Sequence, residues 1–342
     1  MQTIIDRQEL IAAGEAAPLS LPKYRTYAIT NLRGGIGKTS IAFNLSYLAD
    51  NILVADTCPQ GNLSYFYDPN YALTGGVNSA DLIRPYILPG FAHPTHISQK
   101  IGATNEYFAD KNSFFVKSSS DLYILPNQIS TAMVQARTVA GAMQNTMLDS
   151  ILYSLRTELA KEAQITKTDK CLIDTSPFFA GATQLAWNAA DALIIPVRTD
   201  QQSVNSFKLL INMLTTPDSD FLKNLPSDKH MPKIQMVILT HCAWSTREGS
   251  RNKPNKQTKM FLNEIYSIVA RHINLFSTSD PHNHVTILDD FLGSGRVSSA
   301  KSKPIPCLNP GETNVINREK SVVNKSVDKI KNELLFIHNS IW

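Results

Sequence analysis

Short apolar runs alternate along this chain with longer stretches in which apolar positions recur at helical spacing. Runs that are bounded by polar or turn residues and filled with Ile, Leu and Val predict short buried strands. The predicted strands are 27–29, 52–56, 122–126, 171–174, 192–197, 235–240 and 285–288, with 285–288 as the last. Strands alternating with helices indicate an α/β fold with a mainly parallel, doubly wound sheet that is flanked by helices. Ligands of such sheets bind at the carboxyl ends of the strands.

The same pattern predicts how the chain is organised around this sheet. Residues 1–22 are predicted to be an N-terminal appendage with a short helix from Asp6 to Ala17, and 23–342 to be one domain. Residues 66–120 form an irregular insertion rich in Gly, Pro, Asn and Ser, with short helices. A long amphipathic helix is predicted over about 131–163, broken near Gly141, and a C-terminal one over about 321–342.

One segment predicts a phosphate-binding loop, because glycines there join a strand to a helix. Backbone N–H groups of such a loop and the helix N-terminus can surround phosphate oxygens. Lys38 is predicted to reach the β- and γ-phosphates, and the hydroxyl of Thr39 to ligate Mg²⁺. The ordinary pattern has glycine where Leu32 stands, and Arg33 adds a second cation at the mouth of the loop. The predicted cradle consists of Gly34, Gly35, Ile36, Gly37, Lys38, Thr39 and Ser40.

Two predicted strands end in a carboxylate, which suits a magnesium site beside the loop. Asp174 is the first candidate ligand for Mg²⁺, directly or through water, and Asp56 is the second.

The loop, the D-x-x-P-Q-G-N segment at 56–62 and the I-D-T-x-P segment at 173–177 together resemble the ParA family of partition ATPases. This family belongs to the deviant Walker A group of P-loop NTPases that includes MinD, and the resemblance is clear over about 26–65 and 170–215. It implies an ATP- and Mg²⁺-dependent homodimer that closes face to face around two nucleotides. The ATP-bound dimer is expected to bind DNA non-specifically, and a ParB-like centromere-binding partner to stimulate hydrolysis. That cycle would segregate or position plasmid, chromosomal or other cargo in the cytoplasm, at the nucleoid.

The chain departs from the family pattern at two positions. Arg33 replaces the signature lysine that reaches the other subunit's phosphates, and arginine keeps the charge in a form suited to phosphate oxygens. Cys58 replaces the later aspartate of D-x-D-P-Q, which supports hydrolysis by orienting the attacking water. Because a thiol is mostly neutral at pH 7 and a weak acceptor, slow hydrolysis is expected, with Gln60 or a partner residue supplying orientation. A switch that binds ATP and barely hydrolyses it is the alternative.

A basic segment after the strand at 235–240 is the candidate DNA-binding surface, since clustered cations neutralise phosphates without reading sequence. A solvated basic face is the alternative interpretation. The candidate residues are Arg247, Arg251, Lys253, Lys256 and Lys259, with Arg296, Lys301 and Lys303 as a possible extension.

Composition narrows the remaining alternatives. The 342 residues carry a net charge of +4, which permits a nucleic-acid or anionic-membrane partner without requiring one. The four cysteines form no C-x-x-C pair, and no secretory leader or transmembrane run is recognised, so a reducing cytoplasm is expected. A MinD-like membrane-associated switch would use the C-terminal amphipathic helix as an anchor, although packing on the sheet is favoured. A metabolic P-loop enzyme would need a cysteine pair or a substrate pocket that the sequence does not locate. The histidines at 93, 96, 282 and 284 are interpreted as loop residues, not metal ligands.

Overall fold

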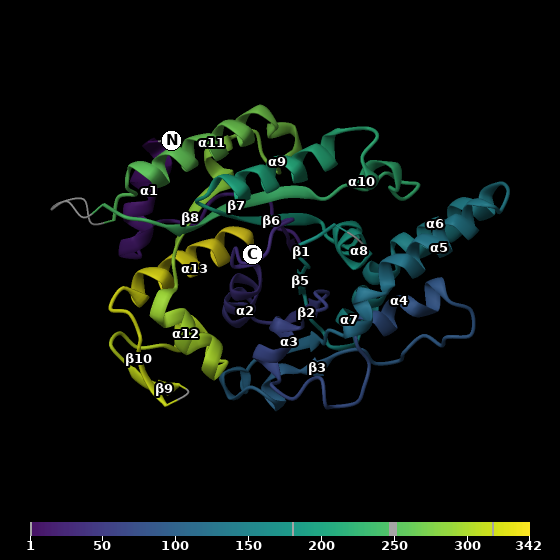
Figure 1. Cartoon of the computed structure of the whole chain (residues 1–342), viewed down its shortest axis with the longest axis horizontal. Helices are drawn as coiled ribbons and strands as arrows, with labels where there is room; N and C mark the ends of the chain where they lie inside the picture. Colours follow the sequence, from purple (N-terminus) through teal and green to yellow (C-terminus); the bar gives the residue numbers. More distant parts are fainter. Residues whose placement is uncertain (1, 180, 246–251, 317) are drawn as a thin grey trace.

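The computed structural model describes residues 2–179, 181–245, 252–316 and 318–342, and its centre is an eight-stranded sheet (Figure 1). The strand order is β3-β4-β2-β5-β1-β6-β7-β8, and every neighbouring pair is parallel except β3 with β4. The predicted fold class is therefore confirmed. The strands are β1 (Thr26–Ile29), β2 (Ile52–Asp56), β3 (Gln99–Lys100), β4 (Ser113–Val116), β5 (Lys170–Asp174), β6 (Ala192–Arg198), β7 (Lys233–Cys242) and β8 (Val285–Asp289).

Helices cover both faces of the sheet because both faces of its strands are apolar. Along β2, Leu53 and Ala55 belong to one buried cluster, while Ile52 and Val54 belong to the other. Alternate side chains of a strand point to opposite faces, so each face needs its own cover. The Leu53 face is covered by α1 (Gln2–Ala13), α4 (Ser79–Ile87), α5 (Leu125–Arg137), α6 (Ala142–Leu152), α7 (Ser154–Ile165), α8 (Ala182–Ala189), α9 (Gln201–Thr215), α10 (Asp220–Lys223) and α11 (Lys256–Arg271). The Ile52 face is covered by α2 (Lys38–Leu48), α3 (Asn62–Tyr67), α12 (Leu292–Lys301) and α13 (Val327–Ile341).

Strand register brings the predicted carboxylates together at one edge of the sheet. Asp56 and Asp174 are the last residues of β2 and β5, and they stand opposite each other in that pair. Ile29, the last residue of β1, pairs with Asp174 on its other side. The loop after β1 therefore starts beside both carboxylates.

The predicted strand at 122–126 is wrong. Residues Ser120–Tyr123 form a 3₁₀ turn, and α5 begins at Leu125 with Pro126 in its first turn. Proline is tolerated there because the first N–H groups of a helix have no intrahelical partner. The strand beside β2 at this side of the sheet is instead β4, which pairs with β2 in parallel. It lies inside residues 66–120, which were interpreted as irregular.

Several predicted boundaries also change. The helix at 131–163 is three helices; the first break contains Gly141 at φ 71, as predicted, and the second falls at Tyr153. The first helix spans Gln2–Ala13 rather than Asp6 to Ala17 and contacts α13 and β8. The strand β8 is the last of the main sheet but not of the chain, because an antiparallel hairpin of β9 (Thr313–Ile316) and β10 (Glu319–Val322) follows.

The C-terminal helix packs on the sheet, as the favoured interpretation predicted. It begins at Val327, later than predicted, because 319–322 pair as β10. Its apolar side, including Ile330, Leu334 and Ile337, is buried in the cluster shared with α2. Over the part of the chain that is described, no helix combines the length and apolarity needed to cross a bilayer.

Candidate nucleotide-binding site

The glycine loop between β1 and α2 adopts the backbone that its sequence requires. Gly35 and Gly37 have φ values of 70 and 95, in the left-handed region that side chains disfavour. Gly37 caps α2, so Lys38 is the first residue of the helix. The Lys38 ammonium is buried and donates a hydrogen bond of 2.7 Å to the backbone oxygen of Arg33, which closes the loop on itself. Burial lowers the pKa of Lys38, while Asp174 and Cys58 oppose that shift.

Asp174 has one oxygen free for a cation. Thr39 Oγ1 donates a 2.8 Å hydrogen bond to Asp174 Oδ2, whereas Oδ1 is buried and has no hydrogen-bond partner in the described residues. Burial, followed by the nearby charge of Asp56, raises the pKa of Asp174 to about 7. A buried, half-satisfied carboxylate next to a hydroxyl is the donor set that a hard cation such as Mg²⁺ prefers, so these residues fit the predicted metal.

Asp56 is engaged differently. Its Oδ1 accepts from the backbone N–H of Cys58 at 3.1 Å, and its Oδ2 accepts from the N–H and the hydroxyl of Ser64 at 2.8 Å. Burial raises its pKa to about 6, and the Ser64 and Cys58 hydrogen bonds oppose that shift. These contacts fix the segment that follows β2, and the suggested metal role of Asp56 stays a prediction.

A cavity of about 190 Å³, the phosphate cavity, lies between the loop and the ends of β2 and β5. It brings together all the predicted cradle residues with Cys58 and Gln60. Burial raises the pKa of the Cys58 thiol to about 12, so this side chain is neutral at physiological pH. The Gln60 side-chain oxygen accepts from Asn62 Nδ2 at 3.4 Å. The cavity is lined by Gly34, Gly35, Ile36, Gly37, Lys38, Thr39, Ser40, Cys58, Gln60, Asn62, Thr175 and Pro177.

Arg33 is bound by its own subunit at the start of α9. It forms an ion pair with Asp200 and donates a 2.7 Å hydrogen bond to Ser203 Oγ. Asp200 caps α9 and also lies 3.4 Å from the Arg198 guanidinium. A carboxylate at a helix N-terminus is favoured by the helix dipole, which keeps Asp200 in the ionised form that pairs with the arginine.

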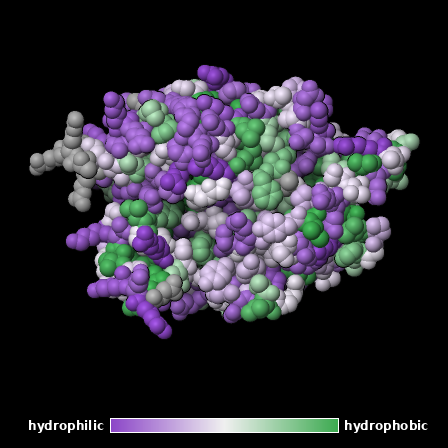
Figure 2. All heavy atoms as spheres, viewed as in Figure 1, coloured by the Kyte–Doolittle hydropathy of each residue, from purple (hydrophilic) through white to green (hydrophobic). Residues whose placement is uncertain are grey.

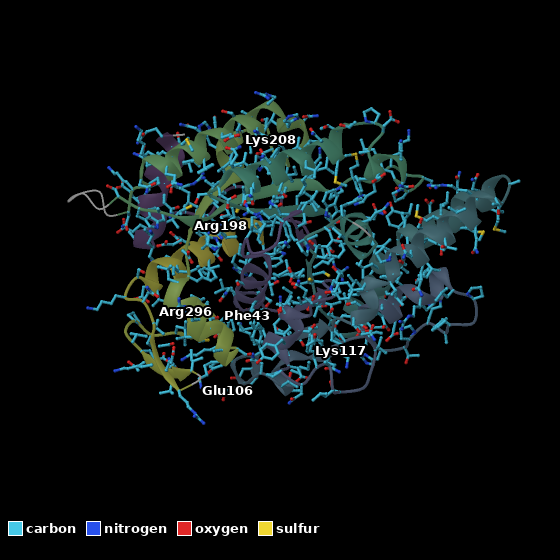
Figure 3. All side chains as sticks on the ribbon, viewed as in Figure 1. Phe43, Glu106, Lys117, Arg198, Lys208 and Arg296 are labelled. Atoms are coloured by element: carbon cyan, nitrogen blue, oxygen red, sulfur yellow. The ribbon has the colours of Figure 1, made fainter. Side chains whose placement is uncertain are left out.

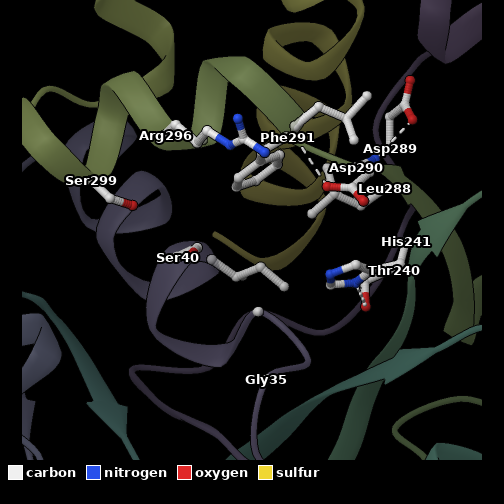
Figure 4. A pocket seen from close by; sticks show the side chains of 14 residues that line it. Gly35, Ser40, Thr240, His241, Leu288, Asp289, Asp290, Phe291, Arg296 and Ser299 are labelled. Atoms are coloured by element: carbon white, nitrogen blue, oxygen red, sulfur yellow. Dashed lines mark hydrogen bonds between the residues drawn. The ribbon is translucent and has the colours of Figure 1, made fainter. Parts of the chain in front are cut away.

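A second and larger cavity, which we name the base cavity for its proposed role, was missed by the sequence reasoning (Figure 4). It measures about 470 Å³ and shares Gly35, Gly37 and Ser40 with the phosphate cavity. Its other walls come from α2, the end of β7, the end of β8 and α12, which no short motif connects. They are formed by Ile41, Thr240, His241, Leu288, Asp289, Asp290, Phe291, Leu292, Gly295, Arg296 and Ser299. One signal was available, since both strand ends lie at the carboxyl edge where such sheets bind ligands.

His241 has an unusual backbone in this wall. Its φ is 55, a conformation that is uncommon for residues other than glycine and that often marks a functional position. Thr240, the residue before it, donates a 3.0 Å hydrogen bond to the backbone oxygen of Ile36. The end of β7 is thereby tied directly to the glycine loop.

The predicted DNA-binding residues are only partly described. Arg247 and Arg251 lie outside the described residues, whereas Lys253 precedes α11 and pairs with Glu9 at 3.5 Å. Lys256 and Lys259 lie in the first turn of α11, over which Figure 2 shows a hydrophilic surface.

The suggested extension of this basic surface is divided. Arg296 lies on α12 and lines the base cavity. Figure 3 shows it far from Lys208 of α9, which pairs with Glu264 of α11 at 2.7 Å and so marks the side of the molecule that carries α11. Lys301 ends α12, and Lys303 is neutralised by Glu312 at 3.0 Å.

The four histidines that the sequence analysis interpreted as loop residues have protein partners. His93 and His96 contact the buried carboxylates of Glu158 and Glu162, at 3.2 and 3.0 Å. His284 is buried, with its Nδ1 2.8 Å from the Gln235 backbone oxygen, and His282 contacts Asp280. No group of three or more His, Cys, Asp or Glu side chains in the described ranges is arranged to hold a metal ion.

Comparison with known proteins agrees with this geometry. A family model described as an AAA domain, AAA_31, matches residues 24–225, which include the loop and both carboxylates. The chain belongs to this family. It is 26% identical over 269 residues to the sporulation initiation inhibitor protein Soj of Bacillus subtilis, covering 77% of this chain and 90% of Soj. The resemblance to ParA-family ATPases is thereby confirmed.

Solved structures share the fold of this ParA-family chain. The structure of apo McdA from Cyanothece matches with a TM-score of 0.55 and 20% identity, over 82% of this chain and 90% of that one. The structure of a Cyanothece McdA variant in complex with ATP matches with a TM-score of 0.54 and 20% identity, over 82% of this chain and 87% of that one. The structure of a plasmid partition protein from Borrelia burgdorferi matches with a TM-score of 0.51 and 17% identity, over 93% of this chain and 100% of that one.

Proposed function

We propose that this ParA-family chain is an ATP-dependent dimerising switch that binds DNA non-specifically and positions or segregates DNA or another cargo. The observation that carries the proposal is the wall common to the two cavities. Gly35, Gly37 and Ser40 line both, so one nucleotide can place its phosphates among the loop amides and its base beyond them. The base cavity, at about 470 Å³, falls within the ~300–1,000 Å³ typical of small-molecule sites.

Thr39 and Asp174 are the residues that would hold Mg²⁺. The ion would neutralise charge on the β- and γ-phosphate oxygens. Among the described residues, Asp174 Oδ1 is buried and has no hydrogen-bond partner, and Thr39 already orients the carboxylate through Oδ2. Burial and the nearby charge of Asp56 raise the pKa of Asp174, and Thr39 and Lys38 offset this only in part, so a bound cation would further stabilise the carboxylate. Lys38 supplies a second positive charge at the same cavity.

Hydrolysis is proposed to be slow because of the side chain at position 58. A neutral thiol accepts a hydrogen bond weakly and cannot draw a proton from water. Gln60 lines the same cavity and has an amide that can orient water, with Asn62 beside it. A ParB-like partner is proposed to supply the remaining orientation or charge.

Dimerisation is proposed to use Arg33. In the single chain this residue is bound by Asp200 and Ser203, so reaching a partner's phosphates requires exchanging one anionic ligand for another. A phosphate oxygen is a comparable or better acceptor for a guanidinium, which makes the exchange dependent on nucleotide.

The decisive experiment measures dimerisation and DNA retention with ATP and with ADP, by light scattering and by retention of random-sequence DNA. The proposal predicts a dimer and salt-sensitive DNA binding with ATP only. Arg33→Ala should lose the dimer, while Arg137→Ala, an exposed arginine on α5, should keep it.

Charge reversal tests the DNA surface separately. The double variant Lys256→Glu/Lys259→Glu should weaken DNA binding with little change in ATP affinity, whereas Lys223→Glu/Lys229→Glu serves as the matched control. Equal DNA retention by both double variants would contradict the assignment. ATP-dependent binding to anionic vesicles in place of DNA would support the MinD-like alternative.

A further inference from the structure

Two consecutive aspartates, Asp289 and Asp290, line the base cavity, and their contacts indicate different roles. Asp289 is fully engaged: its Oδ1 accepts from Trp244 Nε1 at 2.7 Å and from the N–H of Asp290 at 2.8 Å, and its Oδ2 pairs with Lys329 at 3.1 Å. This carboxylate holds the end of β8 against α13 and the strand end at Trp244. It is therefore a structural group.

Asp290 has no comparable engagement. Its Oδ1 accepts a 3.1 Å hydrogen bond from the N–H of Leu292, and no ion pair to it is found within the described ranges. Figure 4 shows its carboxylate directed into the cavity, on the side facing the glycine loop. A half-buried carboxylate with spare lone pairs presents hydrogen-bond acceptors only.

His241 supplies a second acceptor on the same wall. The Thr240 hydroxyl has a single hydrogen, and it is donated to the Ile36 backbone oxygen. Toward His241 Nδ1, 3.3 Å away, that hydroxyl can therefore only accept, so Nδ1 carries the ring hydrogen. Burial lowers the pKa of His241, which favours the neutral ring, while Asp290 opposes that shift. In a neutral ring protonated at Nδ1, the other nitrogen, Nε2, is an acceptor.

We propose that Asp290 and His241 determine base specificity by accepting hydrogen bonds from an exocyclic amine of the bound nucleotide, such as the 6-amino group of adenine. This inference depends on the proposed nucleotide site and names the residues that select its ligand. A 6-oxo purine has an oxygen in place of the amine. That oxygen is itself a hydrogen-bond acceptor, so it could not pair with the acceptors of Asp290 and His241. An unpaired buried acceptor is strongly unfavourable, so discrimination by such a wall is larger than discrimination by shape.

The test compares ATP with ITP, which differs in carrying an oxygen at the 6-position. Calorimetric titration of the full chain with Mg²⁺ present should show ATP bound about 10- to 100-fold more tightly than ITP. Asp290→Asn keeps the shape and adds an amide donor that can pair with the 6-oxo group, so the ATP/ITP ratio should fall toward one. Asp110→Asn, at an exposed position away from both cavities, is the matched control and should keep the parent ratio.

A second variant guards against misfolding of the first. His241→Asn suits the left-handed backbone at this position, but its side chain is too short to place an acceptor where Nε2 lies, so it should also lower the ratio. Equal affinity of the parent for the two nucleotides, or an unchanged ratio in well-folded Asp290→Asn, would overturn this inference and leave the nucleotide site intact. Failure of the parent to bind either nucleotide would instead overturn the proposed function.

Discussion

The phosphate cavity and the base cavity share a wall but are built in different ways. The phosphate cavity, about 190 Å³, is formed by one glycine loop and by the short segments that follow two neighbouring strands. The base cavity, about 470 Å³, is assembled from the ends of β7 and β8 and from α12. The glycine loop, Lys38 and short polar side chains line the first, whereas apolar and polar side chains of distant segments form the second.

This difference suits what each cavity is proposed to recognise. Phosphate oxygens are symmetric and charged, so a tight loop of backbone amides with one lysine suffices, and such a loop is necessarily contiguous in sequence. A base is flat, largely apolar and has a distinctive edge, so it needs separate side chains around it. The first cavity therefore has a sequence signature, and the second depends on tertiary structure.

Removing Lys38 should have the largest effect and acts only on the phosphate cavity. Lys38→Ala is expected to lower ATP affinity by at least about 100-fold, because a buried cation that faces the phosphates is lost. Isothermal titration would measure it, with Lys100→Ala at an exposed position as the control. Undiminished ATP affinity would show that the glycine loop is not the phosphate site.

Asp174→Asn should abolish the contribution of magnesium. In the parent, Mg²⁺ is expected to raise ATP affinity about 10- to 100-fold, and the variant should show little of this gain because its amide lacks the charge that Mg²⁺ prefers. Titrations with Mg²⁺ and with excess chelator separate the two conditions. A variant that keeps the full gain would exclude Asp174 as the ligand.

Cys58→Asp tests the chemistry of the phosphate cavity rather than its affinity. Placing a carboxylate in this wall should raise the hydrolysis rate, by up to about 100-fold if the new group takes a proton from water. Cys58→Ser, which stays neutral, should leave the rate nearly unchanged. Steady-state phosphate release measures both, and a fast parent enzyme that Cys58→Asp does not accelerate would contradict the assigned role.

Glu333→Gln should have the smallest effect, and that effect is on the pH dependence of folding stability. Glu333 supports the base cavity because it accepts a hydrogen bond from Asp289, which lines the cavity. The buried Glu333 carboxylate accepts from the Asp289 N–H at 2.8 Å, and burial raises its pKa to about 8, opposed by Lys329. The folded state therefore binds a proton that the unfolded chain releases near pH 4.5, so stability is lost as pH rises from about 4.5 to about 8. Between pH 6 and pH 8 the parent should lose about 2 kcal/mol relative to the variant in urea unfolding. Parallel pH profiles of the two proteins would show that Glu333 is ionised throughout.

The same contrast explains how much of the molecule could be predicted from sequence. The loop at 34–40, the strands ending in Asp56 and Asp174, and the parallel sheet follow from local apolar runs and glycine positions, and the structure contains them. The strand β4 was missed because its four residues lie among polar and turn residues, and only pairing with β2 makes them a strand.

Other features could not be predicted because they depend on tertiary contacts between residues far apart in the chain. Residues 122–126 have the apolar character of a strand, yet Pro126 suits the first turn of α5, and tertiary packing decides between the two. The Arg33–Asp200 pair and the wall around Asp290 join residues far apart in the chain, and no spacing rule reports such contacts.

The central claim is that one nucleotide spans both cavities, and fragment competition tests it most directly. Inorganic tripolyphosphate carries only the groups proposed to bind in the phosphate cavity, and adenosine carries the base proposed to bind in the base cavity. The account predicts that each displaces a fluorescent ATP analogue competitively. It also predicts that Lys38→Ala weakens displacement by tripolyphosphate alone and that Asp290→Asn weakens displacement by adenosine alone. Displacement by tripolyphosphate with no competition from adenosine, or adenosine bound together with the ATP analogue, would contradict it.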